Sequence, residues 1–189
     1  SASVEDYFGL IRLSGVDEIT TNSTGNTLPS AEVVDPADVA TGGSLADSLQ
    51  GVLIRVENVT VTDANPDGPD NDYKEFAVDG DLRVDDLLYE VTPDPQQGDT
   101  FDALVGPLHY SFDNSKLLPR DENDVIQGPP SLTDLAPSDV YLAVGTTDAQ
   151  TTPPLEVVLN RAPSSPMTVN LTYGDTGIVD GPATIDVPA

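Results

Sequence analysis

The chain of 189 residues carries 33 acidic and 7 basic side chains, which give a formal net charge of −26. A charge of this size repels a nucleic-acid backbone or an anionic membrane surface, so we expect neither as a partner. The absence of cysteine excludes disulfides and thiolate chemistry, and no run of about 18 apolar residues is long enough for membrane insertion.

Alternating apolar and polar residues predict short β-strands along most of the chain, separated by prolines and glycines. Two segments, 35–40 and 44–51, carry helix signals, the second with Ser44 as N-cap and Gly51 as its stop. Segment 52–61 has apolar residues on both faces near its ends. The further strand segments are 76–86 with a turn at Gly80, 100–112 with an interruption at Gly106 and Pro107, 154–161, 167–173 and 183–189. The fold class is therefore all-β.

A change in composition near residue 127 predicts a domain boundary. Before this residue the chain carries 26 acidic and 6 basic side chains, and from it onward 7 and 1. Proline, glycine and serine accumulate in 127–139, where charged residues become sparse. The expected organisation is a first domain at 1–127, a linker at 128–139 and a second domain at 140–189.

Several segments of the first domain resemble parts of a known module: YFGLIRL (7–13), LRVDDLLY (82–89) and LHYSFDNSKLLPR (108–120). They resemble the OB-fold-like module of secreted bacterial proteins, which occurs beside extracellular nucleases and on surface proteins. The resemblance also covers 26–63 and implies an OB-like β-barrel over 1–127. It further implies secretion, and so an extracellular or cell-surface location.

Residues 154–189 resemble the beginning of a bacterial immunoglobulin-like (Ig-like) or Calx-β-like sandwich. Both resemblances are partial, because the barrel module usually has a strand ahead of YFGL and the sandwich normally continues through further strands. Open strand edges expose unpaired backbone groups, which strands from elsewhere can cover. The expected partners are therefore other domains of a longer chain, or further copies of this chain joined head to tail.

The segment DANPDGPDND (63–72) has the composition of a calcium-binding loop. Its first, third, fifth and sixth residues follow an EF-hand-type pattern, in which alternate oxygen ligands surround the ion and Gly68 permits the turn. The twelfth place holds Lys74 instead of glutamate, so the loop is not a true EF-hand. Oxygen ligands without histidine or cysteine favour a hard cation. The predicted calcium ligands are Asp63, Asn65, Asp67, Asp70 and Asp72.

A solvated turn rich in aspartate, asparagine, proline and glycine explains the same segment without a metal, and this alternative stays open. Charge repulsion argues for a cation, because 13 carboxylates and two basic side chains lie between Asp63 and Asp102. Secondary metal candidates, for which polar strand positions are the favoured interpretation, are Asp79, Asp81, Asp85 and Asp86.

Signals of catalysis are weak. His109, the single histidine, lies in the alternating segment LHYSF, where a packed or hydrogen-bonded strand residue is favoured over a catalytic base. The basic residues Lys116 and Arg120 are expected to pair with neighbouring acids such as Asp113 or Asp121. We therefore predict no catalytic residues.

Four aromatic residues raise a separate possibility. Tyr7, Phe8, Tyr110 and Phe112 fit a stacking platform of the kind found in nucleic-acid-binding barrels. A groove for nucleic acid also needs lysine and arginine, which are scarce here. Packing of the four rings into the core is the favoured interpretation.

The sequence predicts a non-catalytic extracellular β-protein, stabilised by calcium, with a structural or adhesive role. In its more specific form the chain is a surface-filament subunit, and strand complementation joins successive copies. The alternative is a pair of accessory domains, binding substrate or glycan, in a larger secreted hydrolase or nuclease.

Overall fold

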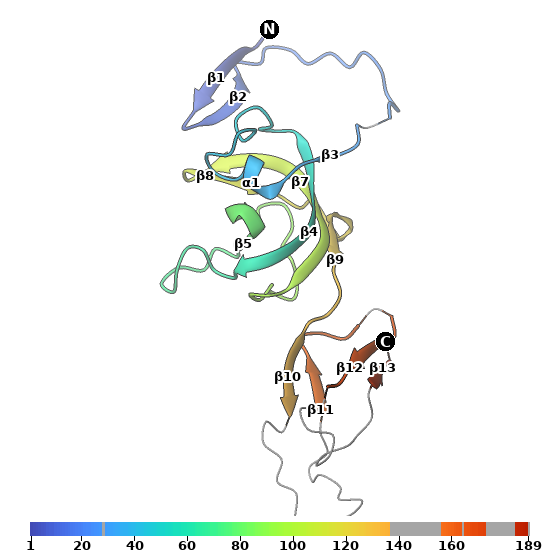
Figure 1. Ribbon diagram of the computed structural model, residues 1–189. Coiled ribbons are helices and arrows are strands. Elements are labelled where there is room, and N and C mark those ends of the chain that lie inside the picture. Colours follow the sequence, from blue (N-terminus) through green and yellow to red (C-terminus); the bar gives the residue numbers. More distant parts are fainter. Residues whose placement is uncertain (28, 137–155, 164, 173–183, 189) are drawn as a thin grey trace, which may run out of the picture. The chain divides into compact units, whose positions relative to one another are not determined.

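The structure is a computed structural model, shown in Figure 1, and describes residues 1–27, 29–136, 156–163, 165–172 and 184–188. The chain divides into two units, Ser1–Gly128 and Pro129–Ala189. Strands predominate in the described part of both, and helices are short. The all-β prediction is confirmed.

The elements of the first unit are β1 (Ser3–Tyr7), β2 (Leu10–Ser14), β3 (Glu32–Val33), α1 (Pro36–Val39), β4 (Leu53–Asp63), β5 (Phe76–Val78), η1 (Asp79–Asp81), β6 (Leu82–Val84), β7 (Thr100–Ser111), β8 (Asn114–Leu117), η2 (Glu122–Asp124) and β9 (Val125–Gln127). Those of the second unit are β10 (Leu132–Ala136), β11 (Glu156–Leu159), β12 (Met167–Asn170) and β13 (Thr184–Val187).

Five strands of the first unit close into a barrel. Their order is β4, β5, β6, β8 and β7, and pairing of β7 with β4 closes the ring. The β6–β8 pair is parallel, whereas the other four pairs are antiparallel. The long strands β4 and β7 curve around the barrel in Figure 1. Two short strands extend this sheet, β3 beside β4 and β9 beside β7.

Strand β4 explains why apolar residues occur on both of its faces. Ile54 and Val56 are buried, and after Asn58 the buried positions become Val59 and Val61. Asn58 has φ of 54°, a left-handed conformation that asparagine tolerates better than most residues. This local irregularity shifts the side-chain alternation by one residue, so both halves of the strand face the barrel core.

Strand β7 runs without interruption, so the predicted break at Gly106 and Pro107 is wrong. Both residues pair with β4, Gly106 with Ile54 and Pro107 with Leu53. The backbone passes so close to the Leu118 carbonyl that a Cβ at position 106 would collide with it. Glycine is therefore required by close approach of two backbones and does not end the strand.

One of the two predicted helices is present. Asp35 caps α1 by accepting a hydrogen bond from the Ala37 amide, with Pro36 at the first helical position. The predicted helix at 44–51 is wrong, because this segment forms successive turns. Ser44 does not cap these turns but donates its hydroxyl to Asp38, at 2.9 Å. The predicted turn at Gly80 is confirmed, between β5 and β6.

The second unit contains two antiparallel strand pairs in its described residues, β10 with β11 and β12 with β13. Strand β10 lies inside the segment 128–139 that the composition assigns to a linker. The glycine and two of the three prolines behind that assignment occupy 128–130, ahead of the strand. Residues 137–155 lie outside the described part, so the Ig-like sandwich stays a prediction.

The described residues include no helix that is long and apolar enough to cross a membrane.

Candidate functional site

The outer face of β5, β6 and β8 collects charged side chains. Phe76, Leu82, Val84 and Leu117 on these strands belong to the barrel core, so their neighbours along each strand face outward. The strand register then brings Arg83 of β6 beside Lys116 of β8. Arg83 and Lys116 are far apart in the sequence, so only the pairing of β6 with β8 places them side by side.

Five of these side chains form one ion-paired group, which we call the charge network: Asp67, Glu75, Arg83, Asp85 and Lys116. The Lys116 ammonium contacts a carboxylate oxygen of Glu75 and lies 2.9 Å from Asp85 Oδ2. The Arg83 guanidinium donates to Asp67 Oδ1 at 2.7 Å and to Glu75 Oε2 at 2.9 Å. Glu75 therefore links both cations.

The network holds its cations in the charged state. Burial lowers the pKa of Lys116, but the hydrogen bonds that its ammonium donates to Glu75 and Asp85 outweigh this effect and raise the pKa above its ordinary value. The pKa of Arg83 rises for the same reason, since bonds to Asp67 and Glu75 overcome the effect of burial. The side chain of Lys116 is only 3% exposed, so its partners are essential to its charge.

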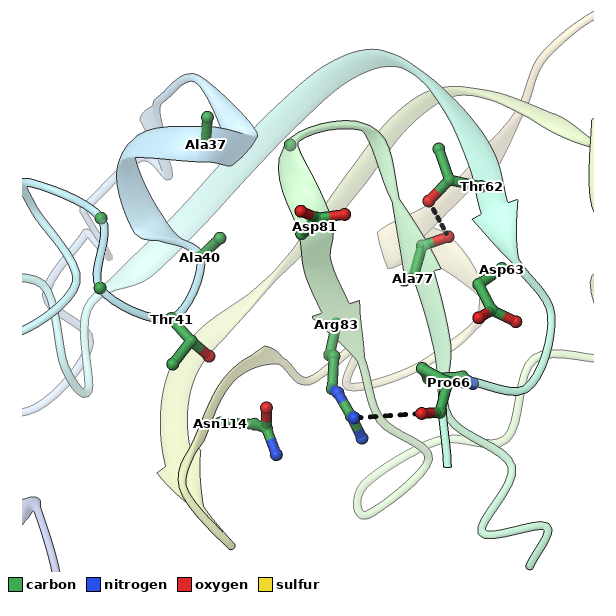
Figure 2. Close-up of a pocket in the computed structure, with 13 residues that line it drawn as sticks. Ala37, Ala40, Thr41, Thr62, Asp63, Pro66, Ala77, Asp81, Arg83 and Asn114 are labelled. Atoms are coloured by element: carbon green, nitrogen blue, oxygen red, sulfur yellow. Dashed lines mark hydrogen bonds between the residues drawn. The ribbon is translucent and has the colours of Figure 1, made fainter. Parts of the chain in front are cut away.

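Two cavities flank Arg83, and Asn114 also lines both. The first has a volume of about 610 Å³, and Figure 2 shows α1 and Thr41 on one side of it and Asp63 and Pro66 on the other. The second, which we call the network cavity, has about 460 Å³. The charge network lies in its wall, and the exposed rings of Tyr73 and Phe112 also line it.

The network cavity is unfavourable for additional negative charge. Burial raises the pKa of Asp86 in its wall, and repulsion from Asp85 and Glu90 raises it further. The cationic groups Arg83 and Lys116 are already paired with carboxylates. The arrangement offers a fixed polar surface more readily than a proton donor or a nucleophile.

The predicted calcium ligands do not converge. Asp63 Oδ1 accepts a hydrogen bond from the Asn65 amide, and Asp72 Oδ1 accepts one from the Lys74 amide. Asn65 donates its side-chain amide to the Gly68 carbonyl. These bonds are the local turn contacts that asparagine and aspartate make in loops.

Asp67 and Asp70 complete the predicted set. Asp67 faces the charge network, where Arg83 holds one of its oxygens, whereas Asp70 is exposed at the loop surface. The second oxygen of Asp67 is buried without a hydrogen bond. Among the described residues, no three histidine or carboxylate side chains are arranged to hold a metal ion. Calcium binding by this loop stays a prediction.

The secondary metal candidates have other contacts. Asp79 accepts a hydrogen bond from the Thr60 amide at 2.7 Å, and Asp85 belongs to the charge network. Asp81 lines the first cavity, opposite α1 in Figure 2, and Asp86 lines the network cavity.

The basic residues of LHYSFDNSKLLPR pair with acids, but not with the expected ones. Lys116 pairs with Glu75 and Asp85, and Arg120 forms two hydrogen bonds with the Asp124 carboxylate, at 2.7 and 2.9 Å. His109 lies on β7 and is half-buried, and burial lowers its pKa.

Core packing of the four aromatic residues is the clearest wrong prediction. Phe8 is 85% exposed and Phe112 is 90% exposed, while Tyr7 and Tyr110 are partly exposed. All four line a third cavity at the end of the barrel unit. The missed signal is that Phe8 and Phe112 each lie in a two-residue turn between strands, where alternation no longer determines burial.

Comparison with protein-family models, with curated proteins and with solved structures finds no match to this chain, so its interpretation depends on the geometry described above.

Proposed function

We propose that the chain is a non-catalytic extracellular β-protein with a structural or adhesive role. The observation that carries this proposal is the charge network, in which the buried Lys116 and the partly buried Arg83 are shared among three carboxylates. Groups that are paired in this way stabilise a surface and fix its shape. Proton transfer instead needs a group that can gain or lose a proton near neutral pH.

The barrel supports the OB-like assignment. We number the barrel strands β4, β5, β6, β7 and β8 as first to fifth. Around the ring their order is first, second, third, fifth and fourth, and the third and fifth strands pair in parallel. OB-folds bind ligands across the face of the second and third strands and the adjoining loops. Here that face carries the internally paired charge network, and the loop between the fourth and fifth strands, β7 and β8, is the turn that holds Phe112. A ligand at this adjoining loop fits both adhesion and the alternative of an accessory domain in a larger secreted hydrolase or nuclease.

The filament form of the proposal has a separate support. Two antiparallel strand pairs are described in the second unit, β10 with β11 and β12 with β13, whereas the Ig-like sandwich that its sequence resembles continues through further strands. A two-stranded sheet is marginally stable alone and gains from added strands. Strand addition from another copy satisfies open edges and joins subunits. An Ig-like unit completed in this way is the geometry that we propose for assembly.

Calcium is the proposed stabilising ion for loop 63–72. The loop sequence holds four aspartates within ten residues, and mutual repulsion between their carboxylates favours a bound cation. Ion binding requires Asp63, Asp70 and Asp72 to exchange their turn contacts, or solvent, for the ion. The hard oxygen donors fit calcium better than a softer metal.

The proposal is tested with the full chain in calcium-containing buffer. We expect regular fibres under negative-stain microscopy, or co-sedimentation of the chain with bacterial cell-envelope material. A dispersed monomer that sediments with no envelope material contradicts the structural and adhesive roles and favours the accessory-domain alternative. Hydrolysis of polysaccharide or nucleic acid by the isolated chain contradicts its non-catalytic character.

A further inference from the structure

Two hairpins of the barrel unit end in exposed phenylalanines. Phe8 and Gly9 form the turn between β1 and β2, and Phe112 and Asp113 form the turn between β7 and β8. All four have positive φ, 52° at Phe8, 86° at Gly9, 49° at Phe112 and 61° at Asp113. Two-residue turns of this type match the natural twist of a hairpin. We call these two turns the hairpin tips.

Phenylalanine is an unfavourable choice at both tips. The left-handed region strains a bulky side chain, and glycine, asparagine or aspartate usually occupies it. Neither ring repays this strain by burial, since Phe8 is 85% and Phe112 90% exposed. Stability of the folded chain therefore does not explain them. Large exposed rings next to each other are typical of a binding surface.

The rings meet around one cavity of about 490 Å³, which we call the tip cavity. Tyr7, Phe8, Tyr110 and Phe112 line it, and they are four of the ten aromatic residues in the chain. The Tyr7 and Phe8 rings pack edge to face with 4.8 Å between their centroids. The Arg12 guanidinium lies 3.6 Å from the centroid of Tyr7, on the ring face. The platform is thus partly ordered before any ligand binds.

The first hairpin is fixed against the barrel. The Gln50 side chain donates to the Gly9 carbonyl at 2.9 Å and accepts from the Ile11 amide at 2.8 Å. Gly9 rests on the Tyr110 ring so closely that a Cβ would enter it. Both contacts hold one tip beside the other. A surface held in this way loses little freedom when it binds a ligand.

Polar groups complete the tip cavity. His109, Ser111 and Asp113 line it together with the rings. Burial lowers the pKa of His109 and so favours its neutral imidazole, a form that can donate one hydrogen bond and accept another. Hydroxyl-rich ligands use mixed donors and acceptors of this kind, while their C–H faces pack on aromatic rings.

We propose that the tip cavity binds a neutral saccharide, with pyranose rings packed on Phe8 and Phe112. The net charge of −26 opposes anionic ligands, nucleic acids and polyuronates alike, and the mixture of rings and polar groups in the cavity wall suits a neutral sugar. Two cations lie near the rings, and both are already paired with carboxylates. Arg12 pairs with Glu5, and Lys116 pairs with Glu75 and Asp85. This inference rests on the proposed adhesive role and names its ligand class.

The test removes both rings without disturbing the turns. Asparagine tolerates the left-handed conformation, so Phe8→Asn/Phe112→Asn keeps the backbone and relieves strain. The probes are soluble neutral glucan, mannan, galactan and xylan, with polyuronate and single-stranded DNA alongside. Affinity electrophoresis of the full chain measures retardation. We expect at least one neutral polysaccharide to retard the native chain, and the double variant to bind it about tenfold more weakly.

Leu88→Asn is the matched control, because Leu88 is exposed but does not line the tip cavity. It should bind like the native chain. Binding that the double variant retains, binding limited to DNA or polyuronate, or no retardation by any neutral polysaccharide overturns the proposal. If fibres or envelope co-sedimentation persist in that case, the structural or adhesive role stands and only the saccharide inference fails.

Discussion

The charge network and the hairpin tips share a boundary at Phe112, yet they use their side chains in opposite ways. The network buries charge and pairs it internally, whereas the tips expose apolar rings that pack on little of the protein. Removing a network group leaves an unpaired buried charge. We expect removal of a tip ring to leave the fold intact, because both phenylalanines are exposed. In this chain the buried, paired charges therefore serve stability, whereas aromatic rings dominate the surface proposed for binding.

The largest expected effect comes from breaking the network at its most buried cation. Lys116→Met leaves Glu75 and Asp85 without their shared ammonium, and we expect a loss of about 3–5 kcal/mol in the free energy of unfolding. Lys74→Met is the control, since Lys74 pairs with Asp94 at the surface, where solvent screens the pair, and its loss should cost far less stability than the loss of Lys116. Denaturant unfolding followed by circular dichroism measures both. Equal losses would contradict a structural role for the network.

Removal of calcium is the next largest effect. We assume that the loop holds calcium and that the buffer supplies the ion at about a hundred times its dissociation constant. Adding a chelator should then lower the free energy of unfolding by about 2–3 kcal/mol. Asp70→Asn should reproduce much of that loss, because Asp70 is exposed and takes no part in the charge network. Asp67→Asn is unsuitable as the test, since it also removes the bond to Arg83. A melting temperature unchanged by chelator supports the solvated loop.

The contact between the first tip and the barrel is tested at Gly9. Gly9→Ala adds a methyl group that collides with Tyr110 and strains a residue with φ of 86°, so we expect a loss of about 1–3 kcal/mol and weaker saccharide binding. Gly98→Ala has nearly the same φ, 91°, and open space around it. The difference between the two variants isolates the collision. If both lose equal stability, the tip is not fixed by Tyr110.

A smaller effect depends on pH. Hydrogen bonds from Arg120 lower the pKa of Asp124 below its ordinary value of 3.8. The pair therefore stabilises the fold above that value, and its contribution disappears as the pH falls through the lower folded-state pKa. Asp124→Asn should cost about 1 kcal/mol at pH 7 and progressively less in acid. Chemical unfolding at several pH values checks this, and a loss independent of pH would exclude the ion pair as its cause.

The smallest effect on stability is expected at the tips. Phe8→Asn/Phe112→Asn should leave the free energy of unfolding unchanged or raise it by up to about 1 kcal/mol, because strain at two positions is relieved. Thermal unfolding of the double variant beside the native chain measures this. A loss above 1 kcal/mol would mean that the rings are part of the packed structure.

The all-β class was predictable because alternation along β4 and the turn at Gly80 are local features. The partners of Lys116 were not, since Glu75 lies 41 residues away and Asp85 31 residues away, and only the strand register brings them together. The predicted interruption of β7 was wrong because Gly106 is required by the close approach of the Leu118 carbonyl to the strand. This contact between two backbones cannot be read from the sequence.

The aromatic residues show a different limit of sequence reasoning. Alternation places Phe112 on the same side as Tyr110, but β7 ends at Ser111 and Phe112 turns outward. The positive φ values of the tips decide the exposure of the rings, and only Gly9 indicates such a value from its residue type. Asp113 is the second residue of its turn and is consistent with that conformation, but aspartate occurs in many other settings.

The most direct test of the central claim compares three proteins in one native gel that contains the neutral polysaccharide found to bind, with a second gel lacking it as the mobility reference. They are the native chain, the network variant Glu75→Gln and the tip variant Phe8→Asn/Phe112→Asn. The account predicts equal retardation of the native chain and the network variant, and little or none for the tip variant. Loss of retardation in Glu75→Gln with retention in the tip variant would place the ligand in the network cavity and contradict the account.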